Sequence, residues 1–173
     1  MNIIDELEWR GAINQQTDAE GLYKLVDQKS ISLYCGIDPT GDSMHIGHLI
    51  PFMILKRFQL AGHHPVILIG GGTGAIGDPS GRTTERVLQT AEQVKHNADS
   101  LTAQMKKLFG EDGSFTMMNN YDWLSKISLL DFLRDYGKLF NINTMLAKDV
   151  VASRMETGIS FTEFSYQILQ SID

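Results

Sequence analysis

The stretch ISLYCGIDPTGDSMHIGHLIPFMILKRFQL, residues 31–60, passes from a β-rich run through a turn into a long apolar segment. Residues 31–37 are rich in β-forming side chains and stop at Asp38-Pro39, which predicts a strand that ends there. Residues 46–60 are apolar nearly all round, which predicts a buried helix. His45 and His48 stand where the turn becomes that helix. The stretch therefore predicts a strand–turn–helix unit with a functional group at its turn.

Predicted strands and helices also alternate in the rest of the chain. PVILIG (65–70) is a continuous apolar run, typical of a parallel strand covered on both faces, and SFTMMN (114–119) predicts a third strand. Helices are expected at residues 3–10, 18–28, 91–109 and 127–138, and in the terminal TEFSYQILQSID, 162–173. This alternation predicts an α/β protein with a Rossmann-like doubly wound parallel sheet, whose ligands bind at the carboxyl ends of the strands. The segments 38–48 and 70–86 both follow strands at that edge.

Composition limits the class of protein. The chain has 173 residues, 42% of them apolar and 21% charged, which fits one soluble globular domain with a sizeable core. Its longest apolar stretch is too short to span a bilayer, and residues 1–10 do not form a secretory signal. The formal net charge of −6 argues against binding a phosphate backbone with this segment alone. Cys35 is the single cysteine, so no internal disulfide is possible and a cytoplasmic location is expected.

A glycine-rich segment follows the second predicted strand. Six glycines fall within residues 70–81, which we expect to be too many for a regular element. Residues 72–77 match G-x-G-x-x-G, but the Asp-Pro-Ser-Gly that follows breaks a helix instead of opening one, so the dinucleotide fingerprint fails on context. The phosphate-loop signature also fails, because Gly81-Arg82-Thr83 lacks the lysine. A plain surface loop remains an alternative, although glycines this dense usually let a ligand approach the backbone.

The two histidines allow three interpretations: a zinc site, a structural helix start and a clamp for an anionic ligand. A zinc site would use His45, His48 and a third ligand, for which Cys35 is the one other soft donor nearby. His63 and His64 lie past the far end of the same predicted helix, out of reach. In the second interpretation Ser43 caps the helix and the histidines only lie near its start.

The third interpretation is a clamp for an anionic ligand. A helix N-terminus offers free N–H groups and positive potential, which suit phosphate. Imidazoles add donors there, Gly47 leaves room for a flat ligand, and Thr40 adds a hydroxyl. The segment SGRTTER contributes two cations four residues apart, Arg82 and Arg86. A nucleoside triphosphate is the ligand that accounts for all of these groups.

Several motifs together resemble one family. HIGH (45–48) after YCGIDPTGDSM, and GGGTGAIGDPSGRTTER after the second strand, closely resemble the tyrosyl-tRNA synthetases, class I aminoacyl-tRNA synthetases of bacterial type. The segments ELEWRG, NNYDW, FLRDYGK and SRMETGISFTEFSYQILQ extend the resemblance along the whole chain. The family's KMSKS-like signature, the second half of its nucleotide-binding fold and its tRNA-binding domains have no counterpart. We therefore expect residues 1–173 to be the N-terminal portion of the catalytic domain, a fragment with incomplete activity.

The resemblance implies a division of roles for ATP, which would be a substrate bound with Mg²⁺ and without a dedicated protein metal site. Thr40 and His45 match the pair that contacts the γ-phosphate, and Arg82 and Arg86 match cations of a mobile loop, the first of which is often lysine. The remaining matches concern the ribose, the adenine and the rest of the nucleotide: His48 and Cys35 for the ribose, Gly47 for the adenine, Gly36 and Asp38 for the nucleotide.

For tyrosine, the resemblance implies that Tyr34 and Asp173 contact the phenol and that Asp78, Tyr166 and Gln170 contact the ammonium group. Spacings of three and four would place Asp173, Gln170 and Tyr166 on one face of the terminal helix. The implied activity is tyrosine–tRNA ligation through tyrosyl-adenylate, with tRNA bound mainly by other regions. Family members form symmetric homodimers, and we expect Phe161 at the interface, with burial of Phe161 and Phe164 in the core as the alternative.

Other classes of protein remain open at this point. A dinucleotide-dependent oxidoreductase would bind nicotinamide, and a binding module descended from a synthetase would bind tyrosine without releasing pyrophosphate. Within the superfamily the tryptophan enzymes are the nearest alternative, and the polar pair Tyr34 and Asp173 favours a phenol over an indole.

Overall fold

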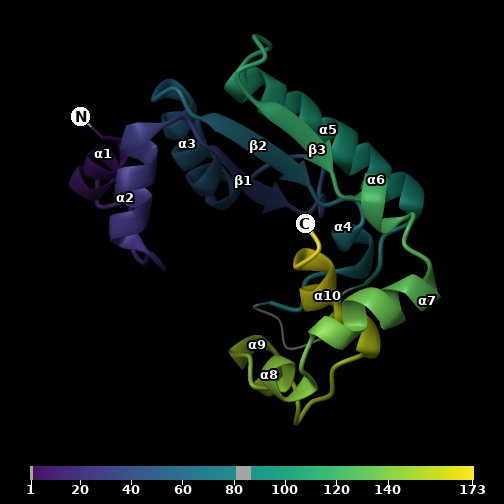
Figure 1. Ribbon diagram of the computed structural model, residues 1–173. Coiled ribbons are helices and arrows are strands. Elements are labelled where there is room, and N and C mark those ends of the chain that lie inside the picture. The colour runs from purple at the N-terminus through teal and green to yellow at the C-terminus, as the bar shows by residue number, and fades with distance from the viewer. Residues whose placement is uncertain (1, 81–86) are drawn as a thin grey trace. The chain divides into compact units, whose positions relative to one another are not determined.

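The computed structural model of the protein describes residues 2–80 and 87–173 (Figure 1). Within it the chain forms two compact units. Of the described residues, the first unit comprises 2–37, 43–68 and 100–118, and the second comprises 38–42, 69–80, 87–99 and 119–173.

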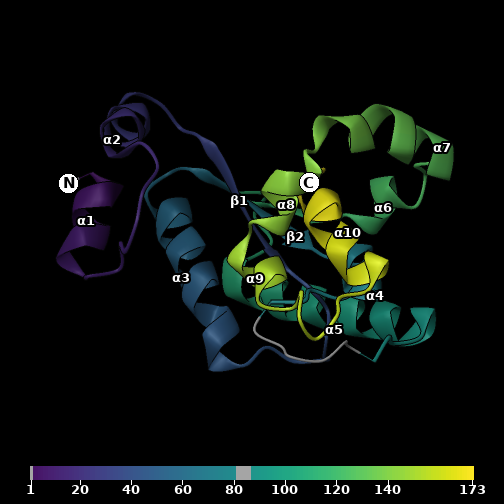
Figure 2. The same ribbon diagram turned by 90° about the horizontal axis from the view of Figure 1, so that it is seen from below.

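The first unit is built on a parallel three-stranded sheet in the order β1-β2-β3. The strands are β1 (Ser32–Ile37), β2 (His64–Ile69) and β3 (Thr116–Asn119), and they are connected through α3 (Ile46–Leu60) and α5 (Ala91–Phe109). Both connections step across the sheet in the same direction, and right-handed crossovers then place α3 and the second half of α5 on one face (Figure 2). The predicted α/β class is confirmed.

Two N-terminal helices, α1 (Ile3–Trp9) and α2 (Ala19–Gln28), complete the first unit. Asn2 begins α1 because its side chain accepts from the backbone N–H of Ile4 at 2.9 Å. An ion pair of 2.6 Å between Arg57 and Glu6 connects α3 to α1. The apolar faces of these helices meet in a buried cluster of Ile3, Ile4, Leu7, Val26 and Phe58.

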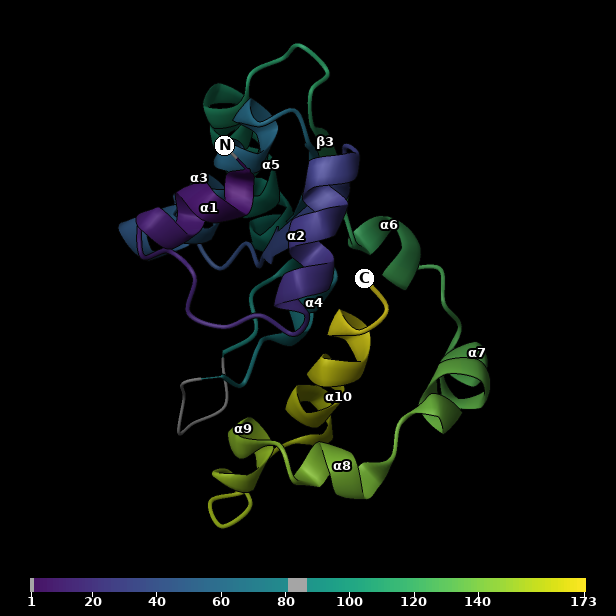
Figure 3. The ribbon, with the colours of Figure 1, turned by 60° about the vertical axis from the view of Figure 1, so that its left-hand side comes forward.

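The second unit is mainly helical. Its helices are α4 (Thr73–Ile76), the first half of α5, α6 (Tyr121–Leu124), α7 (Leu129–Asp131), α8 (Ile142–Leu146), α9 (Asp149–Ala152) and α10 (Phe161–Gln170). The short helices α8 and α9 lie beside α10, as Figures 1 and 3 show from two directions. The unit therefore presents a set of short elements around one longer helix.

The single helix expected at residues 127–138 is wrong. Only α7 is α-helical there, and it is followed by a π-helical turn at Phe132–Tyr136 and a 3₁₀ turn at Gly137–Leu139. Leu129 and Leu130 are 71% and 76% exposed, so few packing contacts hold this segment in α-helical register. The periodicity of the sequence is real, but the apolar side chains that carry it face outward.

Two further expectations about loops are corrected. The glycine-rich segment does contain a regular element, because α4 forms one turn in which Gly74 N–H donates to Gly70 O at 2.7 Å. The segment after residue 138, expected as a loop, contains α8 and α9. Asn141 begins α8 by accepting hydrogen bonds from the backbone N–H groups of Asn143 and Thr144. Helices this short escape a search for amphipathic periodicity.

Candidate active site

Asp38, the residue after β1, is the centre of a polar network in the second unit. Its Oδ2 accepts a hydrogen bond of 2.8 Å from the Tyr166 hydroxyl, and its Oδ1 accepts one of 2.6 Å from the Thr73 hydroxyl. A Cβ on Gly70 would collide with both the Asp38 carboxylate and the Thr73 hydroxyl, so glycine is required there. The dense glycines thus let α4 and the residue after β1 approach each other closely.

Asn120 extends this network toward the end of the chain. The residue is fully buried, its Nδ2 donates to Thr73 Oγ1 at 3.0 Å and to Asp173 Oδ2 at 3.2 Å, and its Oδ1 accepts from Gly72 N–H at 2.7 Å. Thr73 therefore donates to Asp38 and accepts from Asn120. We call the connected side chains the Asp38 network: Asp38, Thr73, Asn120, Tyr166 and Asp173.

Thr73 and Asn120 were missed by sequence reasoning. Asn120 lies in the NNYDW motif, which contributes to the family resemblance but had no role attached to it. A buried asparagine directly after a strand is the signal that could have found it, because buried amides nearly always serve hydrogen-bond networks.

Proton affinities in the Asp38 network follow from burial and from its carboxylates. The pKa of Tyr166 is raised far above its ordinary value, first by burial and then by the charge and hydrogen bond of Asp38. The Tyr166 hydroxyl is therefore a permanent donor. The pKa of Asp173 is also raised, mainly because its carboxylate is partly withdrawn from water, and the charge of Asp38 adds to this while the Asn120 hydrogen bond opposes it.

The position of Asp173 corrects one prediction. Helix α10 ends at Gln170 with Ser171 as its C-cap, so Asp173 does not lie on the helix and does not share its face with Tyr166 and Gln170. Its carboxylate reaches the same network by another route, through Asn120.

The turn after Asp38 is fixed by the start of α5. Asn97 is 1% exposed and donates to the carbonyl of Pro39 at 3.0 Å, while Gln89 donates to the carbonyl of Thr40 at 3.0 Å. Both amides hold backbone atoms and leave the Thr40 side chain exposed. The turn thus presents a hydroxyl on a rigid backbone.

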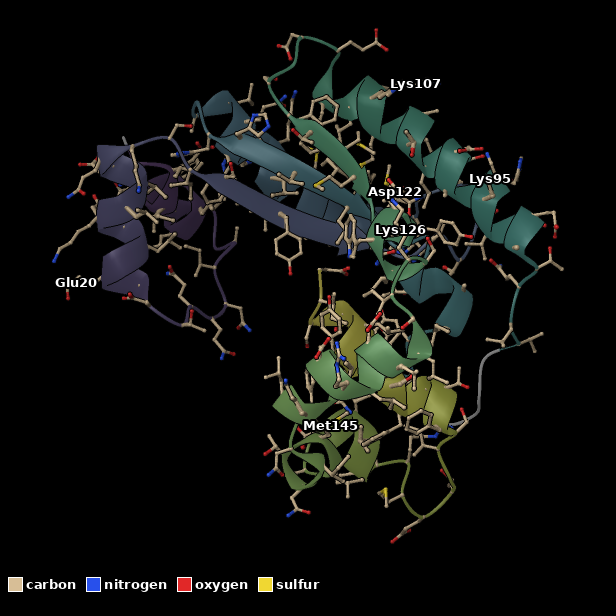
Figure 4. The ribbon with its side chains drawn as sticks, turned by 45° about the vertical axis from the view of Figure 1, so that its right-hand side comes forward. Glu20, Lys95, Lys107, Asp122, Lys126 and Met145 are labelled. Atoms are coloured by element: carbon tan, nitrogen blue, oxygen red, sulfur yellow. The ribbon has the colours of Figure 1, made fainter. Side chains whose placement is uncertain are left out.

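A cavity of about 550 Å³ lies beside this network within the second unit. Asp78, Tyr166 and Gln170, the three residues expected at the ammonium group, all line it. Met145, labelled in Figure 4, contributes to its apolar wall from α8. Its size and mixed lining are typical of a pocket for a small organic molecule.

In the first unit, His45 and His48 lie at the start of α3. His45 is the N-cap, its Nδ1 accepts from Gly47 N–H at 3.1 Å, and the two imidazole rings stack with centroids 3.6 Å apart. The interpretation with Ser43 as cap is therefore wrong. A Cβ on Gly47 would lie 3.0 Å from His45 Cε1, so the lack of a side chain at Gly47 serves this cap.

His48 differs from His45 in its surroundings. Burial, followed by the charge of His45, lowers the pKa of His48, which favours the neutral imidazole at pH 7. Its Nδ1 is buried and has no hydrogen-bond partner among the residues that the structure describes. A neutral imidazole with a free nitrogen can donate or accept one further hydrogen bond.

The end of β1 contributes three candidate residues. Tyr34 is 59% exposed, and the Cys35 thiol is free, with a pKa that burial raises. A Cβ on Gly36 would meet the Leu68 side chain at an ordinary 3.7 Å, so the protein itself does not require glycine there.

The histidines past the far end of α3 do not form a metal site with His45 and His48 in the described parts of the chain. His63 Nδ1 accepts from Ile31 N–H at 3.3 Å, and His64 Nε2 is hydrogen-bonded to Thr116 Oγ1 at 2.8 Å. Residues 2–80 and 87–173 contain no group of three or more His, Cys, Asp or Glu side chains arranged to hold a metal ion. Arg82 and Arg86 lie outside the described residues.

Comparison with protein families gives a match over most of the chain. The model for tRNA synthetases class I (W and Y) matches residues 26–173. Tyrosine–tRNA ligase 1 of Enterococcus faecalis is 80% identical over 173 residues, which are 100% of this chain and 41% of that protein. Tyrosine–tRNA ligase 2 of Bacillus cereus is 75% identical over 175 residues, which cover 100% of this chain and 42% of that protein. The chain thus spans about two fifths of the length of these relatives.

Solved structures are similar as well. A C-terminally truncated mitochondrial tyrosyl-tRNA synthetase of Aspergillus nidulans aligns with a TM-score of 0.87 at 34% identity, covering 99% of this chain and 52% of that one. The corresponding protein of Coccidioides posadasii aligns with a TM-score of 0.82 at 33% identity, covering 100% of this chain and 50% of that one. Among the described helices, none has the length and apolar content that crossing a membrane requires.

Proposed function

Because the chain belongs to the class I tRNA synthetases of the tryptophan and tyrosine group, we propose that it supplies the amino-acid and ATP sites of a tyrosine–tRNA ligase. The observation that carries this proposal is the cavity lined by Asp78, Tyr166 and Gln170 beside the Asp38 network. Carboxylate, phenol and amide oxygens are acceptors suited to an ammonium group. We also propose that residues 1–173 are the N-terminal part of the catalytic domain.

The proposed reaction needs no nucleophile from the protein. The tyrosine carboxylate attacks the α-phosphorus of ATP in line, tyrosyl-adenylate forms, and pyrophosphate leaves. The tyrosyl group is then transferred to the terminal ribose of tRNA. Catalysis consists of holding the reactants in line and of stabilising the charge that builds up on the leaving pyrophosphate. Mg²⁺ enters with ATP as part of the substrate.

The turn after β1 and the start of α3 are assigned to ATP. In this proposal His45 and Thr40 contact the γ-phosphate, and Arg82 and Arg86 contribute further positive charge. His45 would exchange its hydrogen bond with Gly47 N–H for the phosphate, and the freed N–H would point to the same anion.

The ribose and the base complete the ATP assignment. Neutral His48 and Cys35 are assigned to the ribose. The two glycines that leave room beside the nucleotide are Gly36 and Gly47.

The second unit is assigned to tyrosine. Asp78, Tyr166 and Gln170 would hold the ammonium group, and Asp173 and Tyr34 are proposed for the phenol hydroxyl from the family resemblance alone. The raised pKa of Tyr166 supports this arrangement, because a phenol that stays protonated keeps donating to Asp38 and keeps its lone pairs for the ammonium group. An indole would offer Asp173 one N–H and leave the Tyr34 hydroxyl without a polar partner, which favours tyrosine over tryptophan.

The proposal includes tRNA as the acceptor, bound mainly by parts of a longer protein, a symmetric homodimer and a location in the cytoplasm. The exposed ring of Phe161 beside that of Phe164, with centroids 6.5 Å apart, supports the dimer, because contiguous exposed apolar patches mark interaction surfaces.

The test uses a chimera in which this chain replaces the matching segment of the Enterococcus faecalis ligase, called here the ligase chimera. We expect tyrosine-dependent ATP–pyrophosphate exchange when each of the twenty amino acids is supplied in turn. Exchange with tryptophan, or tyrosine binding without exchange, would contradict the proposal and favour the sibling enzyme or a binding module. A titration with a nicotinamide dinucleotide distinguishes the oxidoreductase alternative.

A further inference from the structure

A buried ion pair beside the residues assigned to the substrate connects α10 to the segment before it. Arg154 Nη2 lies 3.1 Å from Glu163 Oε2, and the two side chains are 5% and 1% exposed. The same Nη2 donates to the carbonyl of Gly158 at 3.1 Å. Arg154 therefore contacts both the loop that leads into α10 and the first turn of α10.

The loop between these residues is closed by its own hydrogen bonds. Gly158 N–H donates to the carbonyl of Arg154 at 2.8 Å, and Ser160, the N-cap of α10, accepts from Glu163 N–H at 3.2 Å. Gly158 has a φ of +93°, a conformation that side chains rarely adopt. The start of α10 is thus fixed by the cap and by the ion pair together.

Stability alone does not account for this pair. Arg154 Nε, Arg154 Nη1 and Glu163 Oε1 are buried and have no hydrogen-bond partner among the described residues. A buried ion pair with incomplete hydrogen bonding is usually no more stabilising than apolar side chains of the same size. The pair therefore calls for another explanation.

The position of Glu163 on α10 suggests that explanation. Glu163 lines the cavity of about 550 Å³, and so do the residues three, four and seven positions later: Tyr166, Gln167 and Gln170. Residues at this spacing share one helical face. A rotation or shift of the first turn of α10 would displace the Tyr166 hydroxyl and the Gln170 amide together.

We propose that Arg154 and Glu163 are positioning residues for the amino-acid site, an inference that rests on the proposed function. The ion pair sets the rotation of α10 about its axis and its position along that axis, so that Tyr166 and Gln170 meet the ammonium group of the substrate. It acts through the helix and does not touch ATP, so its loss changes the KM for tyrosine and not the KM for ATP.

The experiment separates positioning from stability with two variants of the ligase chimera. Arg154→Met combined with Glu163→Leu removes both charges and keeps the volume. We expect a cooperative thermal transition close to that of the unchanged chimera, and a KM for tyrosine raised roughly tenfold, because misplaced binding groups lose affinity. Glu163→Gln keeps an acceptor for Arg154 but leaves the arginine charge unbalanced. It should melt earlier and keep the KM for tyrosine within about threefold.

The control removes an exposed ion pair from the same unit, through Lys95→Met combined with Asp99→Leu. This pair is 2.7 Å long, its side chains are 77% and 68% exposed, and Lys95 is labelled in Figure 4. Both KM values should stay unchanged in this control.

Three results would overturn the inference. The first is a folded double variant with an unchanged KM for tyrosine, and the second is a double variant that does not fold, because the pair would then serve the fold itself. The third is a KM for tyrosine that follows the melting temperature across both variants. Failure of the proposed function is a separate result, since it appears as absence of tyrosine-dependent exchange in the unchanged chimera.

Discussion

The hydroxyl of Tyr166 donates a hydrogen bond of 2.8 Å to the carboxylate of Asp38, a residue 128 positions earlier in the chain. This bond joins α10 to the turn after β1. It also fixes the direction of the Tyr166 lone pairs, which would otherwise rotate with the hydroxyl. The same side chain lines the cavity assigned to tyrosine.

The first prediction concerns this hydroxyl. Tyr166→Phe in the ligase chimera should raise the KM for tyrosine about ten- to a hundredfold, because a hydrogen bond to a charged group contributes about 1.5–3 kcal/mol and every 1.4 kcal/mol is tenfold in affinity. The KM for ATP should stay unchanged. Steady-state ATP–pyrophosphate exchange measures both constants, and Tyr23→Phe is the matched control because that hydroxyl makes an exposed hydrogen bond to Asp5 in the first unit. Equal effects of the two substitutions would contradict the assignment of Tyr166.

The second prediction concerns pH. The raised pKa of Asp173 means that folding disfavours its ionised form, so its contribution to stability decreases as the pH rises from the ordinary 3.8 through the raised value. Recognition of the phenol needs the ionised carboxylate as acceptor, so kcat/KM for tyrosine should rise over the same window. The acid limb of the profile should therefore lie above pH 3.8.

Asn120→Ala tests the cause of that limb. The Asn120 hydrogen bond favours the ionised carboxylate, so its removal should move the acid limb to higher pH. The variant should also lose about 2 kcal/mol of unfolding free energy, since it leaves buried partners unpaired. Asn119→Ala changes the neighbouring amide, which accepts from Tyr121 N–H, and should leave the limb in place. If the acid limb does not move in Asn120→Ala, it does not arise from the titration of Asp173.

The third prediction concerns the γ-phosphate. Thr40→Ala combined with His45→Ala should lower kcat for adenylate formation roughly a hundredfold or more, with tyrosine binding nearly unchanged, because these donors act on charge that develops in the transition state. His45 is also the N-cap of α3, and loss of a cap costs about 1 kcal/mol. His45→Asn restores a capping side chain and serves as control for stability. A double variant with wild-type kcat would remove both residues from the mechanism.

The fourth prediction concerns assembly. Phe161 is 70% exposed and its ring centroid lies 6.5 Å from that of Phe164, so the two rings form an apolar patch at the start of α10. We expect a two-fold interface that includes Phe161, and Phe161→Asp should shift the ligase chimera toward monomer in sedimentation equilibrium. Trp9→Asp, at another exposed aromatic residue, is the control. A dimer of undiminished affinity in Phe161→Asp would place the interface elsewhere.

Sequence alone predicts the elements whose apolar side chains are buried. The bounds of α5, residues 91–109, coincide with the prediction, because Leu101, Met105 and Phe109 recur on a buried face. The break after α7 was not predictable from periodicity, because the leucines there face outward and do not enforce one helical form.

The candidate site was likewise predictable from the sequence only in part. Local motifs single out His45, His48 and Asp38 as candidates, because a few adjacent residues determine where turns form and where helices begin. The partners of Asp38 are 35 and 128 positions away, and no local pattern connects them. Asp173 shows the same limit, because the spacing argument put it on a helix that ends three residues earlier, at Gln170.

The last prediction concerns the choice between tyrosine and phenylalanine. A site that hydrogen-bonds the substrate hydroxyl rejects the analogue without it, because its own polar groups would be left unpaired, and tyrosine-specific synthetases are themselves the known example. Tyr34, in the middle of β1, is 59% exposed, so its side chain is accessible to a ligand. Asp173 is already held by Asn120 and has further acceptor capacity for the phenol.

The substitutions Asp173→Asn and Tyr34→Phe should therefore have different effects on activity and on specificity. Asp173→Asn removes the charged acceptor and should lower kcat/KM for tyrosine by about one to two orders of magnitude, since hydrogen bonds to charged groups contribute about 1.5–3 kcal/mol. Tyr34→Phe should leave tyrosine activation within about tenfold of normal and should lower the ratio of kcat/KM values for tyrosine and phenylalanine by a similar factor, because it removes one neutral partner of the phenol. Pyrophosphate exchange in the ligase chimera with each amino acid measures this ratio. If it were the same in Tyr34→Phe and the unchanged chimera, the phenol would lie away from Tyr34, because a lost hydrogen bond to the hydroxyl has to reduce the advantage of tyrosine.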